Sequence, residues 1–223
     1  PVYKIASFEI TDIPLIEYAA SKHKPMVLAT GIATEEDIQL AVEACRRMGN
    51  NDITVLKCTS SYPAPVEEAN LCMIRDLAER FQVKSGLSDH TLGSVSPIVA
   101  VTQGASMIEK HFILNRSIGG PDCSFSMEEK DFAQMVKDVR MAELSLGKTT
   151  YELTEKMRGS RSASRSLYVA EDMKAGEVIT ERNVRSVRPG FGLHPKYLKD
   201  ILGKNVNRDL EKGTRFALEY VNG

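Results

Sequence analysis

The sequence predicts an α/β domain built on parallel strands, followed by a small domain that is mostly β. Two observations predict the first part. Up to residue 147, short apolar runs alternate with amphipathic helical patterns. The apolar runs are rich in Val, Ile and Leu, as strands buried on both faces are. From Ser166 onward, short β-like runs separated by Gly and by charged turns predict the second part.

The strands and helices of the first part follow one another in order. Thr34 and Asp37 have the spacing of a capping box at the start of one helix, which Gly49 can end. Ser126 and Glu129 have the same spacing at the start of another, which runs towards Gly147. A third helical pattern covers residues 70–81. The predicted strands are Tyr3–Ile10, Pro25–Thr30, Ile53–Thr59, Val83–Ser88 and Ala105–Phe112.

Five parallel strands leave two architectures open. A closed eight-stranded barrel needs three more strands, upstream of Pro1. The alternative is an open doubly wound sheet, but no G-x-G-x-x-G follows any predicted strand to support a dinucleotide site.

Composition excludes several classes of function. The 223 residues carry a formal net charge of −1, so no strong field favours nucleic acid. No apolar run is long enough to span a membrane, and the first residues do not form a signal peptide. The four cysteines include no C-x-x-C pair, which indicates reduced thiols in a cytoplasmic protein. Two of them, Cys45 and Cys58, lie in apolar patterns and are expected in the core.

We expect three segments: an α/β domain over residues 1–147, a linker over 148–165 and a β domain over 166–223. The linker and its borders interleave basic residues with Ser160, Ser162 and Ser164. A solvated linker is the simpler interpretation, and a phosphate-binding strip is the alternative. The basic residues are Lys156, Arg158, Arg161 and Arg165.

The β domain has three strand-like runs, Leu167–Val169, Val184–Val187 and Thr214–Leu218. Two of its turns share the pattern D-x-x-x-G-x, at residues 172–177 and 209–214.

Two histidines carry the strongest chemical signal. His90 and His111 each end an apolar run, and the ends of parallel barrel strands open on one rim, where active sites lie. Two imidazoles with open positions suit a divalent transition metal such as Mn²⁺. Glu109 could orient a ligand from the second coordination shell, and Ser88 shares a strand face with His90. The alternative is that each histidine is a hydrogen-bonded structural residue.

Other polar side chains gather at the same predicted rim. Lysine, hydroxyl and backbone N–H groups are what a phosphate group needs. Lys4 and Ser7 have opposite parity, so both face the site only if the strand breaks between them. Individually, each of these residues has an ordinary structural explanation as a cap, turn or surface group. The candidates are Lys4, Ser7, Glu9, Ser60, Tyr62 and Asp122, together with Arg188 in the β domain.

Taken together, the motifs resemble the sialic acid synthase family, and among its members the pseudaminic type. The resemblance covers nearly the whole chain in order and implies the C-terminal part of a TIM (β/α)8 barrel followed by an antifreeze-like (SAF) domain with a β-clip fold. The matching stretches are KIASFEI (Lys4–Ile10), ATGIAT (Ala29–Thr34), KCTSSYPAP (Lys57–Pro65), LSDHTLG (Leu87–Gly93), IEKHF (Ile108–Phe112), GGPD (Gly119–Asp122) and RPGFG (Arg188–Gly192).

The resemblance also implies a reaction, the condensation of phosphoenolpyruvate with an amino sugar, and a role for each candidate. His90 and His111 would bind the metal, with Mn²⁺ expected and Mg²⁺ or Co²⁺ as alternatives. Lys4, Ser7 and Ser88 would hold phosphoenolpyruvate. Ser60 stands where sialic acid synthases often have Asn. The sugar contacts would be Glu9, Tyr62 and Asp122, with Arg188 reaching the site of a partner in a domain-swapped homodimer.

By the same resemblance, three barrel strands and a catalytic Glu precede Pro1, so we expect residues 1–223 alone to be inactive. An N-acetylneuraminate or legionaminate synthase is the nearest alternative. An alternative of another class is a non-catalytic carbohydrate-binding protein with the same fold.

Overall fold

The computed structural model describes residues 2–222. The chain divides into two compact units, Pro1–Lys148 and Thr149–Gly223, which are described separately below. The predicted linker, residues 148–165, is not all irregular, since it contains the short helix α6 (Glu155–Ser160).

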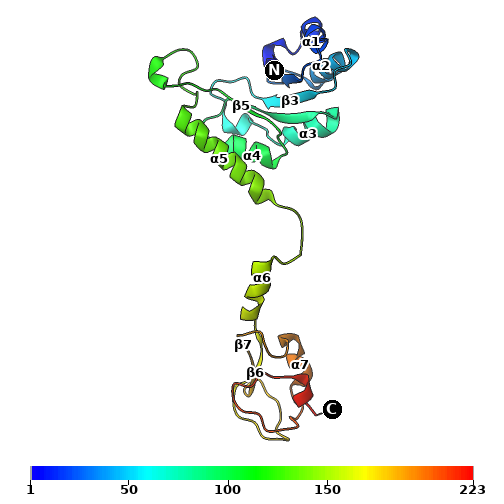
Figure 1. Ribbon diagram of the computed structural model, residues 1–223, viewed down its shortest axis with the longest axis vertical. Helices are drawn as coiled ribbons and strands as arrows, with labels where there is room; N and C mark the ends of the chain where they lie inside the picture. The colour runs from blue at the N-terminus through cyan, green and yellow to red at the C-terminus, as the bar shows by residue number, and fades with distance from the viewer. Residues whose placement is uncertain (1, 223) are drawn as a thin grey trace. The chain divides into compact units, whose positions relative to one another are not determined.

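The first unit is built on one parallel sheet whose strands follow the chain in the order β1-β2-β3-β4-β5. Alternate residues such as Leu28 and Val55 point outward into a core shared with the helices. Figure 1 shows those helices on the outside of the sheet. The strands are β1 (Tyr3–Ile5), β2 (Met26–Ala29), β3 (Ile53–Cys58), β4 (Lys84–Asp89) and β5 (Ile108–Lys110).

The sheet is strongly curved. Lys4 Nζ on β1 lies 2.9 Å from Glu109 Oε1 on β5, although these are the two outermost strands. Adjacent strands lie about 4.8 Å apart, so a flat sheet would separate these two strands by roughly 19 Å. The unit is therefore a half-barrel, and the doubly wound alternative is excluded.

The helices confirm part of the predicted pattern. In α2, Thr34 and Asp37 form the expected capping box. The second predicted box is wrong, because α5 begins after Glu128 and Ser126 Oγ instead donates to the Asp122 carbonyl. The helices of this unit are α1 (Ile13–Ala20), α2 (Glu35–Arg47), α3 (Met73–Phe81), α4 (Val95–Thr102) and α5 (Glu129–Leu146).

The second unit is a small antiparallel domain around its own core. Strands β6 (Ser166–Val169) and β7 (Val184–Val187) pair, and Leu167 and Phe216 are among the residues buried behind them. The third predicted strand, Thr214–Leu218, is absent from the described residues apart from an isolated bridge between Tyr168 and Arg215. The unit also contains the short helix α7 (Leu198–Ile201).

The two similar turns of the second unit cap each other. Asp172 Oδ1 accepts the backbone N–H of Lys212 at 2.7 Å, and Asp209 Oδ1 accepts that of Ala175 at 2.9 Å. The repeated D-x-x-x-G-x pattern thus builds a reciprocal pair of hydrogen bonds between the two turns. One bond joins residues 40 positions apart in the sequence, and the other joins residues 34 positions apart.

Candidate active site

Two histidine rings meet at the carboxyl end of the sheet. His90 follows β4 directly and His111 follows β5, and these strands are neighbours. Their ring centroids are 5.2 Å apart, with the ring planes inclined at 63°. The side chains that the sequence places at two separate strand ends therefore form one cluster.

The ring of His90 is held in a defined orientation. Its Nδ1 lies 2.8 Å from the carbonyl oxygen of Thr59, so Nδ1 carries the proton and the Nε2 lone pair is available. Burial lowers the pKa of His90, but the hydrogen bonds with Cys58 and Thr59 outweigh it and raise the pKa above its usual value. Metal-binding histidines commonly donate their second N–H to a carbonyl in this way.

His111 is more open and has a different partner. Its Nδ1 lies 3.6 Å from Asp122 Oδ2. Burial lowers the pKa of His111, and the nearby charge of His90 lowers it further. A lowered pKa favours the neutral imidazole, which is the form that binds a metal ion.

Aromatic rings enclose the histidine pair. The centroid of Tyr62 is 4.2 Å from that of His90 and 6.0 Å from that of His111. Phe125 lies 5.0 Å from His111 and 5.7 Å from Tyr62, so the two aromatic rings pack against His111 as neighbours. Tyr62 and Phe125 fix the rings by packing and reduce the access of water to them.

A charged cluster lies on the concave face of the sheet. Glu109 Oε1 accepts from Lys4 Nζ at 2.9 Å and from Ser88 Oγ at 2.7 Å. Burial raises the pKa of Glu109, whereas Lys4 and Ser88 lower it by more, so the carboxyl is ionised. Glu109 therefore bonds to Lys4 and Ser88, whereas the ring N–H of His90 is bonded to the Thr59 carbonyl, so no hydrogen bond links Glu109 to His90.

A small polar cradle follows β2 and β3. Gly31 donates its N–H to Ser7 Oγ at 3.0 Å, and a Cβ at Gly31 would collide with both Ser7 Oγ and Ser60 Oγ. Ser60 Oγ is buried without a hydrogen-bond partner among the described residues. Cys58 is buried beside the cradle, and its thiol contacts the Ser7 side chain. The unpaired, buried hydroxyl of Ser60 next to Gly31, which has no side chain, is suited to bind an oxygen of a small anion.

The strand ends between Lys4 and Ser7, as it must if both side chains are to face the site. Strand β1 ends at Ile5 and a turn of 3-10 helix begins at Ser7. Glu9 ends that turn, where one of its carboxylate oxygens accepts the N–H of Ala6 at 2.8 Å.

A buried ion pair that sequence reasoning missed supports both histidines. Lys110 Nζ lies 2.6 Å from Asp89 Oδ2, and both side chains are only 1% exposed. Lys110 also donates to the Thr91 carbonyl, and Thr91 N donates to Asp89 Oδ1. Because Asp89 precedes His90 and Lys110 precedes His111, this pair fixes the two strand ends together. The signal available in the sequence was that an acidic residue precedes His90 and a basic residue precedes His111.

The donor set fits a divalent cation in part. His90 and His111 offer two imidazole nitrogens, which suit Mn²⁺, Zn²⁺ or Co²⁺. Within residues 2–222, no group of three or more His, Cys, Asp or Glu side chains is arranged to bind a metal ion. Further ligands would have to come from substrate, water or another segment of protein.

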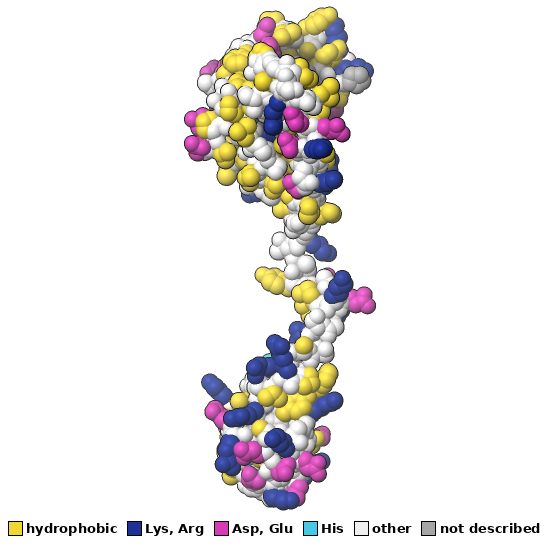
Figure 2. All heavy atoms as spheres, turned by 90° about the vertical axis from the view of Figure 1, so that its left-hand side faces the viewer, with side chains coloured by type: hydrophobic (Ala, Val, Ile, Leu, Met, Phe, Trp, Pro, Cys, Tyr) yellow, Lys and Arg dark blue, Asp and Glu magenta, His cyan; other side chains and the backbone are white. Residues whose placement is uncertain are grey.

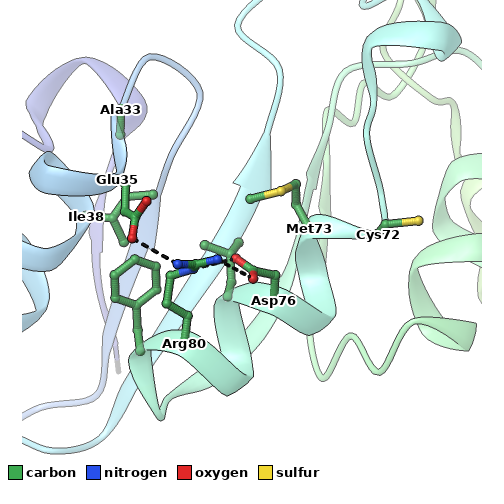
Figure 3. Close-up of a pocket in the computed structure, with 9 residues that line it drawn as sticks. Ala33, Glu35, Ile38, Cys72, Met73, Asp76 and Arg80 are labelled. Carbon is green, nitrogen blue, oxygen red and sulfur yellow. Dashed lines mark hydrogen bonds and ion pairs between the residues drawn. The ribbon is translucent and has the colours of Figure 1, made fainter.

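The unit has another hollow, which none of the predicted site residues lines. It is a groove of about 370 Å³ between α2 and α3, and Arg80 is among the residues that line it. Arg80 bonds to Asp76 at 2.8 Å and to Glu35 at 3.0 Å, as Figure 3 shows. Its charge is therefore already compensated.

Comparison with known proteins identifies the family. The NeuB family profile matches residues 1–151, and the SAF domain profile matches residues 164–215. The chain belongs to the NeuB family. The resemblance drawn from the SDHT, EKHF and GPD motifs is confirmed at this level.

Relatives of this NeuB-family chain share much of its sequence. It is 50% identical to the pseudaminic acid synthase of Helicobacter pylori over 99% of the chain and 65% of that protein. It is 46% identical to the pseudaminic acid synthase of Campylobacter jejuni (strain 81-176), over 95% of the chain and 62% of that protein. Identity to the N,N'-diacetyllegionaminic acid synthase of Legionella pneumophila is 33%, over 98% of the chain and 63% of that protein. The chain thus spans just under two thirds of the length of these relatives.

Solved structures share the fold. The spore coat polysaccharide biosynthesis protein SpsE of Bacillus subtilis matches with a TM-score of 0.64 and 31% identity, over 100% of this chain and 68% of that one. The N-acetylneuraminic acid synthetase of Leptospira borgpetersenii matches with a TM-score of 0.66 and 33% identity, over 71% of this chain and 55% of that one. The small unit is accordingly an SAF, or antifreeze-like, domain.

None of the helices in residues 2–222 combines the length and the apolar character needed to cross a bilayer. All four cysteines are free thiols, and Cys45 and Cys58 are buried, as expected.

Proposed function

We propose that this chain carries the greater part of a pseudaminic acid synthase, which condenses phosphoenolpyruvate and water with 2,4-diacetamido-2,4,6-trideoxy-L-altrose to give pseudaminic acid and phosphate. The observation that supports this choice most is the gap in identity between relatives. Two pseudaminic acid synthases share 50% and 46% of their residues with the chain, against 33% for a legionaminic acid synthase.

The chemistry of the concave face is suited to that reaction. Lys4 Nζ has three donor protons, so it can keep its bond to Glu109 and still bind a phosphate oxygen. The hydroxyls of Ser7 and Ser60 would donate to the same phosphate as it takes up negative charge on leaving. Ser88 would join them by turning its single O–H from Glu109 to the phosphate. Ser60 fits this role because its hydroxyl lacks another partner among the described residues.

His90 and His111 would hold the divalent ion, which we propose is Mn²⁺. When bound, such an ion supplies Lewis-acid polarisation of the sugar aldehyde, which makes its carbon a better target for C3 of phosphoenolpyruvate. Tyr62 packs against His90 and Phe125 packs against His111 at this position. Glu9 and Asp122 would bind sugar hydroxyls. Arg188 lies in the SAF domain, and we propose that it contacts the sugar in the site of a second copy, in a domain-swapped dimer.

Phosphate release in the presence of Mn²⁺ tests the proposal. Two proteins are compared, residues 1–223 alone and the same residues joined to the N-terminal segment of the Helicobacter pylori relative. Each receives phosphoenolpyruvate with the altrose, mannosamine or legionaminate-type amino sugar. We expect release only from the joined protein and fastest with the altrose derivative.

A preference for another sugar would assign the chain to the neuraminate or legionaminate branch. No release with any sugar, from a joined protein that is folded, would support the non-catalytic carbohydrate-binding alternative.

A further inference from the structure

The SAF domain has a pocket of its own, apart from the residues assigned to the synthase site. Its volume is about 270 Å³, near the lower end of the range for small-ligand sites. It lies where the basic and Ser-rich strip of the sequence meets the Gly-rich loop 188–192. Residues around it include Arg161, Ser162, Ser164, Arg165, Gly190 and His194.

Backbone bonds fasten the loop to the strip. Gly190 N donates to the Ser162 carbonyl at 2.9 Å. Ser166 Oγ is buried, donates to the Pro189 carbonyl at 2.7 Å and accepts from Gly192 N at 2.8 Å. At Gly190 a Cβ would meet Ser164 Oγ, so glycine lets the loop approach the strip without displacing that side chain. The pocket is therefore built by the fold and is more than a chance gap between exposed side chains.

Positive charge at the pocket is uncompensated. Across residues 2–222, neither Arg161 nor Arg165 nor His194 forms an ion pair. Arg165 Nη1 donates to the Ser186 carbonyl at 2.6 Å, which fixes its guanidinium while leaving other N–H groups available.

The whole unit is basic. Residues 149–223 contain fourteen Lys and Arg and ten Asp and Glu, a net charge of +4 in a chain whose total is −1. Figure 2 shows Lys and Arg side chains spread over the visible face of this unit. Such a surface attracts anions to the pocket.

His194 adds a donor. Its Nδ1 lies 3.1 Å from the backbone N–H of Lys196 and accepts it, so the ring proton is on Nε2. The ring therefore presents an N–H group at Nε2, and the pocket combines two guanidinium groups, the Ser164 hydroxyl and a ring N–H, whereas the Ser162 and Ser166 hydroxyls donate to backbone carbonyls.

We propose that this pocket binds a phosphoryl group. Guanidinium groups bind phosphate oxygens through paired N–H donors, and Ser hydroxyls complete such sites. The ligand is either free inorganic phosphate or a phosphate ester, and the shared group is recognised in both cases. This inference does not depend on the proposed synthase reaction.

Amide NMR spectra of ¹⁵N-labelled chain 1–223 test the site directly. Inorganic phosphate, phosphoenolpyruvate and N-acetylneuraminic acid are titrated separately at constant ionic strength. We expect saturable shifts at residues 161–166 and 190–194 with the two phosphate ligands. Equal affinity for both would indicate recognition of the phosphoryl group alone, and tighter binding of phosphoenolpyruvate would indicate an ester ligand. Shifts with the sugar acid only would overturn the proposal, since they would indicate a carboxylate site.

Three variants separate a site from general electrostatics. Arg161→Gln should weaken phosphate binding at least about tenfold, since it removes charge-assisted hydrogen bonds. Arg165→Gln should weaken phosphate binding by a similar factor. Well-dispersed amide spectra serve as the control that each variant is folded. Arg208→Gln removes one positive charge from the same unit outside the pocket and should change the affinity less than about twofold. Equal losses in all three variants, or shifts without saturation, would contradict the proposal.

Discussion

Lys4 on the first strand and Glu109 on the last strand form an ion pair with an N–O distance of 2.9 Å across the concave face of the sheet. Four strand-to-strand steps separate them, so this bond exists only because the sheet is bent into half of a barrel. The same bend brings residues from β1, β4 and β5 to one position, which is the site proposed for the synthase chemistry.

Replacing Glu109 by Gln should reduce the pH dependence of stability in acid. Lys4 and Ser88 depress the pKa of Glu109 in the folded state, so its stabilisation is present above the unfolded pKa of about 4.3 and is lost as pH falls through the folded value. Because the side chain is 42% exposed, the effect should stay below about 1 kcal/mol. Urea unfolding at pH 6 and pH 3 measures it. If the free energy of unfolding changes equally with pH in the original protein and in Glu109→Gln, the Lys4–Glu109 pair contributes nothing to stability.

The buried pair of Lys110 and Asp89 should be important for stability. Lys110→Met leaves the Asp89 carboxylate buried without its partner, which should cost about 3–5 kcal/mol in the free energy of unfolding. Lys84→Met breaks the exposed pair with Asp52, and this control should cost less than about 1 kcal/mol. Urea unfolding of both variants gives the comparison, and similar losses would contradict the account.

The cysteines should differ sharply in reactivity. Burial raises the pKa of the Cys45 thiol to about 11, so almost none of it is thiolate at pH 8. Cys72 is exposed and has no such protection. Mass spectrometry after brief iodoacetamide treatment should find Cys72 modified and Cys45 intact, until urea unfolds the protein. Early modification of Cys45 would show that the α2 core opens readily.

An added methyl group at Gly31 should damage the polar cradle. In Gly31→Ala the new Cβ meets Ser7 Oγ and Ser60 Oγ, so affinity for phosphoenolpyruvate should fall by about tenfold or more. Gly159→Ala is the matched control, because a Cβ there meets nothing within 4 Å. Calorimetric titration measures both, and unchanged affinity in Gly31→Ala would remove the cradle from the substrate site.

Much of the fold could be predicted from local patterns. The five apolar runs predicted the parallel strands, and the capping box predicted the start of α2. Two strands are shorter than predicted, since β1 ends at Ile5 and β5 covers only Ile108–Lys110. The Ser126 box failed because Ser126 Oγ has a nearer acceptor, the Asp122 carbonyl, in the preceding turn. Helices α1 and α4 were not predicted from the sequence. Helix α4 is apolar on nearly all sides, so it has no helical periodicity to detect.

The candidate site was predictable in its residues but not in its connections. Strand ends indicated His90 and His111, yet the partner of His90 is a backbone carbonyl, which no side-chain pattern reveals. Lys110 and Asp89 look like ordinary rim charges in the sequence, and only the register of β4 against β5 pairs them. Long-range contacts of this kind depend on tertiary structure rather than on local sequence.

The central claim is that His90 and His111 share one divalent cation. Imidazole resonances of the ¹⁵N-labelled chain, followed as substoichiometric Mn²⁺ is added, test it most directly because paramagnetic broadening detects even weak binding. We predict that the signals of His90 and His111 broaden first and together, while those of His23 and His194 stay sharp. Equal broadening of all four histidines, or persistence of the His90 and His111 signals, would contradict the claim.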